Sequence, residues 1–193
     1  MHTEGISLSW LGPFGWPSRG PSSLGPIPAT AGVYLLCFAY ADGFLIYGAG
    51  VTSRLFTTRL REHTRKYESG AYTILYPEAA SQGVRQELWH GWAEARRPER
   101  IEEFARRREE LVGAARRQLC AFRIFVAELP AVDRLPNRVE AAVMDALYSA
   151  PAPFSALPDR GMYLSRRNRT QKPVIARHRC ASTLHALPES MEV

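Results

Sequence analysis

GVYLLCFAYADGFLIYG, residues 32–48, is the stretch of sequence from which the fold can be argued. Residues 32–40 form a run of β-branched and aromatic side chains, and a second apolar run follows at residues 44–47. Asp42 and Gly43 separate the two runs, and an Asp-Gly pair in this position is typical of a tight β-hairpin. The sequence therefore predicts two antiparallel strands here.

Helical patterns dominate the chain beyond this hairpin. Helices are predicted at residues 55–67, 87–97, 99–119 and 138–148, and a third strand at residues 122–129. We expect a small α/β (α+β) domain in which a three-stranded antiparallel sheet is flanked by helices.

The expected organisation has three parts. Residues 1–31, rich in Gly, Pro, Ser and Trp, are predicted to form an extended arm. Residues 32–180 would form the domain, with a helical insertion at about 82–119, and residues 181–193 a tail.

The composition excludes several classes of protein. The longest uncharged stretch, residues 20–41, is interrupted by Pro and Gly, so we expect neither a membrane span nor contact with a membrane. The first residues lack the basic start of a secretory signal. The 3 cysteines lie far apart without a CxxC pair, which favours a reducing cytoplasm over a disulfide framework or a zinc site.

The net charge of +6 is concentrated near the C-terminus. Residues 159–179 hold seven bases and one acid, so this segment carries the whole excess of 25 Lys and Arg over 19 Asp and Glu. Such a segment is typical of phosphate contacts, although a solvated basic loop has the same composition. The candidate nucleic-acid contacts are Arg160, Arg166, Arg167, Arg169 and Lys172.

Charged residues fall on the apolar faces of two predicted helices when each is drawn at about 100° per residue. Glu140 lies within the arc of Val139 and Val143, whereas Arg138 falls on the far side. A carboxylate on a core-facing stripe is unfavourable unless it is paired or binds a metal, so a structural ion pair is one interpretation.

The earlier helix shows the same feature. Arg59 and His63 are one helical turn apart and fall among Leu55, Phe56 and Tyr67. A cation, an imidazole and the carboxylate of the later helix together form a set suited to phosphodiester hydrolysis.

The chain resembles the GIY-YIG nuclease family at these residues. In chain order they are Gly32-Val33-Tyr34 for the first motif, Ile46-Tyr47-Gly48 for the second, Arg59 and His63 on the next helix, Glu140 on a later helix, and Asn168 for the late asparagine. The resemblance covers about residues 28–172, with a long insertion between residues 67 and 120.

The resemblance implies a metal-dependent endonuclease that hydrolyses DNA and acts alone, as restriction enzymes do. Glu140 would bind one Mg²⁺ or Mn²⁺, and Tyr34 would take the proton of the attacking water with help from His63. Arg59 would stabilise charge on the phosphoryl oxygens. DNA is the expected partner, and a homodimer would provide a second active site for a double-strand cut.

The second motif departs from the family pattern. Ile46 stands where a tyrosine is usual, and the tyrosine comes one position later. A shift of one residue points a strand side chain to the other face. Either a bulge re-aims Tyr47, or the hydroxyl is missing from the site.

Two other functions stay open. The first is a degenerate family member that binds nucleic acid without cutting it. The second is a helical interaction protein built on residues 99–119, in which Glu140 would pair with Arg59 in a buried salt-bridge network.

Overall fold

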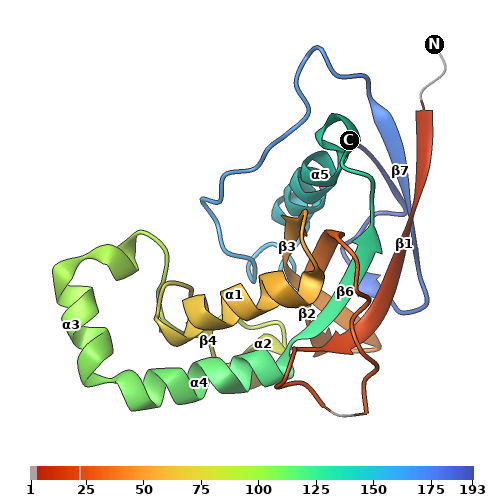
Figure 1. Ribbon diagram of the computed structural model, residues 1–193. Helices are drawn as coiled ribbons and strands as arrows, with labels where there is room; N and C mark the ends of the chain where they lie inside the picture. The colour runs from red at the N-terminus through yellow and green to blue at the C-terminus, as the bar shows by residue number, and fades with distance from the viewer. Residues whose placement is uncertain (1–3, 22) are drawn as a thin grey trace.

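The computed structural model describes residues 4–21 and 23–193 and shows one large curled sheet with helices around it (Figure 1). The strands are β1 (Glu4–Gly15), β2 (Gly32–Tyr40), β3 (Gly43–Thr52), β4 (Ile74–Leu75), β5 (Glu87–Trp89), β6 (Arg123–Glu128), β7 (Val174–Cys180), β8 (Leu184–His185) and β9 (Ser190–Glu192). The helices are α1 (Phe56–Glu68), α2 (Pro77–Ala80), α3 (Pro98–Arg106), α4 (Arg108–Ala121) and α5 (Leu135–Ser149). Seven strands form the main sheet in the order β8-β3-β2-β6-β1-β7-β9, and β4 pairs with β5.

The hairpin and the third strand predicted from the sequence form the centre of this sheet. β2 pairs antiparallel with β3 on one side and with β6 on the other. Gly32 begins β2 at a φ of +145°, and a Cβ there would lie 2.2 Å from the backbone oxygen of Ala127. Glycine is therefore required for β2 and β6 to approach each other.

The expected small three-stranded sheet is wrong, because both ends of the chain add strands to it. β1 pairs antiparallel with β6 and parallel with β7, and β9 pairs with β7. The result is a mixed seven-stranded sheet curled into a half-barrel. Neither the predicted arm nor the predicted tail is separate from the sheet.

The Gly- and Pro-rich composition of residues 1–31 did not indicate the strand β1 that forms there. Leu8 and Trp10 are buried while Ser7 and Ser9 are exposed, which is the alternation of a strand with one face on the core. The Gly and Pro residues of segment 1–31 favoured an irregular arm instead. The pairing of β1 with β7 joins segments at opposite ends of the chain (Figure 1).

Two predicted helices are confirmed, as α1 and α5. The helix predicted at 87–97 is wrong: its residues form β5 and a short 3₁₀ turn, Glu94–Arg96, because β5 pairs with β4. The helix predicted at 99–119 is divided into α3 and α4, which meet at an angle beside Arg107 (Figure 1). Among the described residues, no helix has both the length and the apolar character to cross a bilayer.

Each face of the sheet carries its own core. α5 packs on the face that presents Val33 and Leu35, and α1 and α4 cover the face that presents Tyr34, Leu36 and Phe38. Alternate residues of β2 therefore enter opposite cores. Tyr34 belongs to the face beneath α1.

Arg138 does not lie on the solvent side of α5 as the helical wheel suggests. It is 2% exposed, and its guanidinium donates to Asp133 and to the backbone oxygens of Lys172 and Val193. The C-terminal end of the chain covers this side of the helix, which the pattern of the helix itself does not reveal.

Candidate active site

Tyr34 and His63 are in direct contact between the sheet and α1. The Tyr34 hydroxyl oxygen lies 2.6 Å from Nε2 of His63, and the two residues are 3% and 8% exposed. The Tyr34 ring passes over Gly50 on the neighbouring strand, where a Cβ would lie 2.3 Å from the hydroxyl oxygen. The predicted inward position of His63 is confirmed.

Burial keeps both groups of this pair uncharged. Loss of solvation raises the pKa of Tyr34 to about 12, although the positive charge of Arg59 opposes the shift. Loss of solvation lowers the pKa of His63 to about 3, and the charge of Arg59 adds to this effect. At neutral pH this is therefore a hydrogen bond between two uncharged groups, in which the phenol donates to Nε2 when the His63 proton is on Nδ1.

Arg59 lies beside this pair with part of its hydrogen-bonding capacity unused. One terminal nitrogen donates to Glu62 over 3.3 Å, and the side chain is 35% exposed. Its Nε is buried and has no hydrogen-bond partner among the described residues. Glu62 is engaged more closely with Arg54, through two bonds of 2.6 and 2.8 Å.

Glu140 is on α5, across the sheet from α1, and is only partly exposed. Burial raises its pKa to about 7, although the charge of Arg59 works against this shift. The charge of Glu140 in turn contributes to the raised pKa of Tyr34. Within the described part of the chain, Glu140 forms no ion pair, so the salt bridge to Arg59 required by the interaction-protein alternative is not formed.

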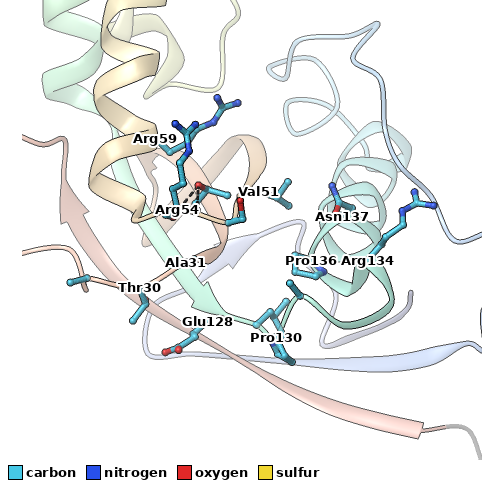
Figure 2. A pocket seen from close by; sticks show the side chains of 15 residues that line it. Thr30, Ala31, Val51, Arg54, Arg59, Glu128, Pro130, Arg134, Pro136 and Asn137 are labelled. Carbon is cyan, nitrogen blue, oxygen red and sulfur yellow. Dashed lines mark hydrogen bonds between the residues drawn. The ribbon is translucent and has the colours of Figure 1, made fainter.

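A groove of about 1020 Å³ opens beside Arg59, between the start of α1 and the start of α5. Figure 2 shows Arg54 and Arg59 on one wall and Arg134 and Asn137 on the other. Arg134 also contacts Ser165, so the basic segment near the C-terminus borders the groove. Cations on both walls suit a polyanionic strand lying in the groove.

A β-bulge lies at Tyr47, but it does not bring the Tyr47 hydroxyl to the site, so of the two alternatives raised by the sequence the structure shows the missing hydroxyl. Leu36 pairs with Gly48 and Cys37 with Ile46, so Tyr47 is the extra residue of the bulged strand. Its side chain enters the same core as Tyr34. Its hydroxyl nevertheless donates to Asp159 over 2.8 Å, which places it in a second buried network.

Asp159 is the centre of that second network. It is 5% exposed and accepts hydrogen bonds from Tyr47, from Trp92 over 2.7 Å and from Arg85 over 2.6 Å. Burial is the main cause of a pKa of Tyr47 well above its usual value. Tyr47 is therefore a buried phenol that anchors Asp159 rather than a contact of His63.

The structure places Asn168 on an exposed loop. Its side-chain oxygen accepts from the backbone nitrogens of Thr170 and Gln171, both over 3.1 Å. This is the local pattern by which Asn closes a turn. Among the described contacts, none joins Asn168 to Tyr34 or Glu140.

The predicted DNA-contacting residues differ in how far they are already engaged. Arg166 forms two bonds of 2.7 Å with Asp145, and Arg167 pairs with Glu192. Arg160 lies over the ring of Tyr148. The two remaining residues are exposed and have no ion pair in the described part of the chain: Arg169 and Lys172. The role of all five in DNA contact stays a prediction.

Sequence reasoning missed several residues around the site: Gly50, Glu62, Tyr72, Trp92 and Asp159. Glu62 had a local signal, because it is three residues from Arg59 on the same helix. No sequence motif connects Gly50 with Tyr34. The two residues lie opposite each other only because β2 pairs with β3. The other residues meet through tertiary contacts.

The donor set fits a hard divalent cation that keeps most of its water. Glu140 presents a carboxylate with no ion-pair partner in the described residues, and these residues contain no cluster of three or more metal-binding side chains. Mg²⁺ is usually held by one or two carboxylates together with water and substrate phosphate. Glu140 would hold such an ion.

Comparisons with family models, curated proteins and solved structures find no match for this chain. Membership of the GIY-YIG family is therefore a proposal that rests on the residues of the site.

Proposed function

We propose that the protein is a metal-dependent endonuclease of the GIY-YIG type that hydrolyses phosphodiester bonds in DNA. The observation that supports this proposal is the contact of Tyr34 with His63. Arg59, whose charge acts on the pKa of both residues and of Glu140, lies at a groove with cations on both walls. One strand and two helices far apart in the sequence supply these side chains.

The expected setting of this activity is the cytoplasm. Cys37, Cys120 and Cys180 are free thiols, which is consistent with a reducing compartment. DNA would be the partner, in the manner of a restriction enzyme that acts alone, and a homodimer would bring two active sites to the two strands.

Tyr34 and His63 provide a path for the proton of the attacking water. The water proton passes to the Tyr34 oxygen while the Tyr34 proton moves to Nε2 of His63. The water oxygen forms its bond to phosphorus as the bond to the leaving oxygen breaks, and that oxygen takes a proton from solvent. Because the pKa of His63 is about 3 without substrate, the negative charge of the bound phosphate is needed to stabilise the imidazolium.

Arg59 and Glu140 would stabilise the negative charge of the phosphate during cleavage. The exposed part of the Arg59 guanidinium, which lines the groove, would bind the non-bridging phosphate oxygens, where negative charge develops. Glu140 would hold Mg²⁺ or Mn²⁺, and the bound ion would supply further positive charge to the phosphate.

Nicking of supercoiled plasmid in Mg²⁺ and Mn²⁺ titrations tests the proposal. We expect the wild-type protein to nick, and Glu140→Gln and Arg59→Ala to abolish nicking while DNA binding in a gel shift largely survives. Tyr34→Phe should lower the rate by about 10²- to 10⁴-fold, the usual contribution of an acid–base group.

Tyr47→Phe is the matched control, because the Tyr47 hydroxyl serves Asp159 and not His63. It should lower stability and leave the cleavage rate within a few-fold of wild type. Plasmid that stays intact with the wild-type protein across both metals would contradict the nuclease proposal.

A binding protein without cleavage is the second candidate function. One observation favours it: Tyr34 is only 3% exposed and is a neutral phenol at physiological pH. The same plasmid experiment separates the two candidates, since this one predicts a gel shift without nicking in either metal.

A further inference from the structure

A row of aromatic rings leads from the candidate site to the surface. The His63 ring centre lies 5.4 Å from that of Tyr72, and the Tyr72 ring centre lies 4.9 Å from that of Trp92. The planes within each pair are tilted by 38° and 33°. We call these three residues the aromatic row; it begins at the buried contact with Tyr34 and ends at Trp92, which is 37% exposed.

Trp92 is held firmly although it is exposed. Its indole nitrogen donates to Asp159 over 2.7 Å, and its backbone nitrogen donates to Ala71 over 2.8 Å. Asp159 is itself fixed by Tyr47 and Arg85. The backbone of Trp92 has a φ of +60°, a conformation uncommon for a large side chain. An exposed ring that is already ordered loses little entropy when a ligand stacks on it.

Cations flank the aromatic row. A hollow of about 420 Å³ is lined by Tyr72 and His63 together with three cations and one acid: Arg59, Arg65, Lys66 and Glu62. Arg65 and Lys66 are exposed and form no ion pair within the described residues. Aromatic rings beside free cations are the combination by which proteins bind single-stranded nucleic acid, with bases on the rings and phosphates on the cations.

Taking DNA as the substrate, which rests on the proposed function, we propose that the aromatic row binds an unpaired base next to the phosphodiester to be cut. Because Tyr72 lies between the rings of His63 and Trp92, the base would stack on the exposed ring of Trp92 at the end of the row. Backbone phosphates would lie against Arg65 and Lys66. In a continuous duplex, both faces of each base are covered by neighbouring bases, so no face is free to stack. The preferred substrate class is therefore flapped, single-stranded or otherwise locally unpaired DNA.

Fluorescence anisotropy in EDTA tests this preference without cleavage. The probes are a fluorescein-labelled DNA hairpin with an unpaired thymine flap and a fully paired hairpin with the same number of phosphates. We expect the wild-type protein to bind the flap more tightly. Trp92→Ala should weaken flap binding by about 5- to 150-fold, the effect of losing one stacking ring, and leave duplex binding unchanged.

Two further variants separate stacking from folding. Trp92→Phe keeps a ring but loses the bond to Asp159, and it should retain most of the preference for the flap. Ile101→Ala removes an apolar side chain that is 57% exposed on α3 and lines neither the hollow nor the groove, and it should change nothing. Thermal melting of each variant establishes that it is folded.

Each outcome decides between the proposals. A flap preference that survives in folded Trp92→Ala, or an equal loss in Trp92→Phe, overturns the role of the aromatic row. Wild-type protein that nicks plasmid but binds both hairpins equally also overturns it, and leaves the endonuclease intact. A preference for the flap that depends on Trp92, without cleavage in either metal, supports base binding and contradicts the endonuclease proposal. Tighter binding of a matched RNA flap overturns DNA as the ligand.

Discussion

Glu140 is a side chain whose burial lowers the stability of the folded protein. Its carboxylate is largely removed from water, forms no ion pair among the described residues, and has a pKa raised to about 7 from a usual value of 4.5. A buried carboxylate with no partner is unfavourable for stability alone, so its position favours a role in binding a ligand.

Replacement of Glu140 by Gln should stabilise the metal-free protein at high pH. Because the pKa is raised on folding, the stability associated with the protonated carboxyl is full below about pH 4.5 and is lost as pH rises through about 7. In EDTA, Glu140→Gln should match wild type near the lower limit and exceed it by up to about 3 kcal/mol near pH 8, measured by urea unfolding.

The exposed Glu189 provides the control, since Glu189→Gln should show no such pH-dependent gain. A Glu140→Gln protein that is less stable than wild type near pH 8 would instead support the buried salt-bridge network.

At the scale of elements, the site depends on how β2, β3 and α1 are aligned. Leu45 and Tyr47 alternate regularly into the same core as Tyr34, and the bulge at Tyr47 shifts the rest of the strand so that Gly50 lies opposite Tyr34. The Tyr34 ring can therefore pass over Gly50 and reach His63 of α1. The sequence motif placed the second glycine at Gly48, but the glycine in close contact with the Tyr34 ring is Gly50.

Alanine substitutions at these two glycines test the alignment. Gly50→Ala would place a Cβ 2.3 Å from the Tyr34 ring and hydroxyl, so the ring must move and the contact with His63 must break. A displacement of about 1 Å can lower a rate by about 10²-fold, and we expect a loss of this order in single-turnover cleavage.

Gly48→Ala is the matched control, because nothing lies within 4 Å of the added Cβ. It should cleave at nearly the wild-type rate. Equal rates for the two variants would show that the Tyr34 ring does not need its position over β3.

At the scale of the whole molecule, the ends of the chain complete the sheet that supports the site. β1 lies between β6 and β7, and the indole nitrogen of Trp10 donates to His178 over 2.9 Å, across 168 residues of sequence. Residues 4–15 are therefore part of the sheet and its core rather than an extended arm.

Substitution of Trp10 should test this arrangement through stability. Trp10 is 3% exposed, so Trp10→Ala should lower the free energy of unfolding by about 3–5 kcal/mol in urea denaturation. Leu11→Ala, at a neighbouring side chain that is 52% exposed, should stay within about 0.5 kcal/mol of wild type. An arm outside the core would give small and similar effects at both positions.

The sequence alone determined the three central strands, the helices α1 and α5, and the inward position of His63, because each depends on a periodicity of neighbouring residues. It also identified the group formed by Tyr34, Arg59, His63 and Glu140 as candidates. Only the tertiary structure decided which strands the chain ends join, that Tyr47 serves Asp159, and that Trp92 stacks on Tyr72. These contacts join segments far apart in the chain, and a local pattern carries no information about a distant partner.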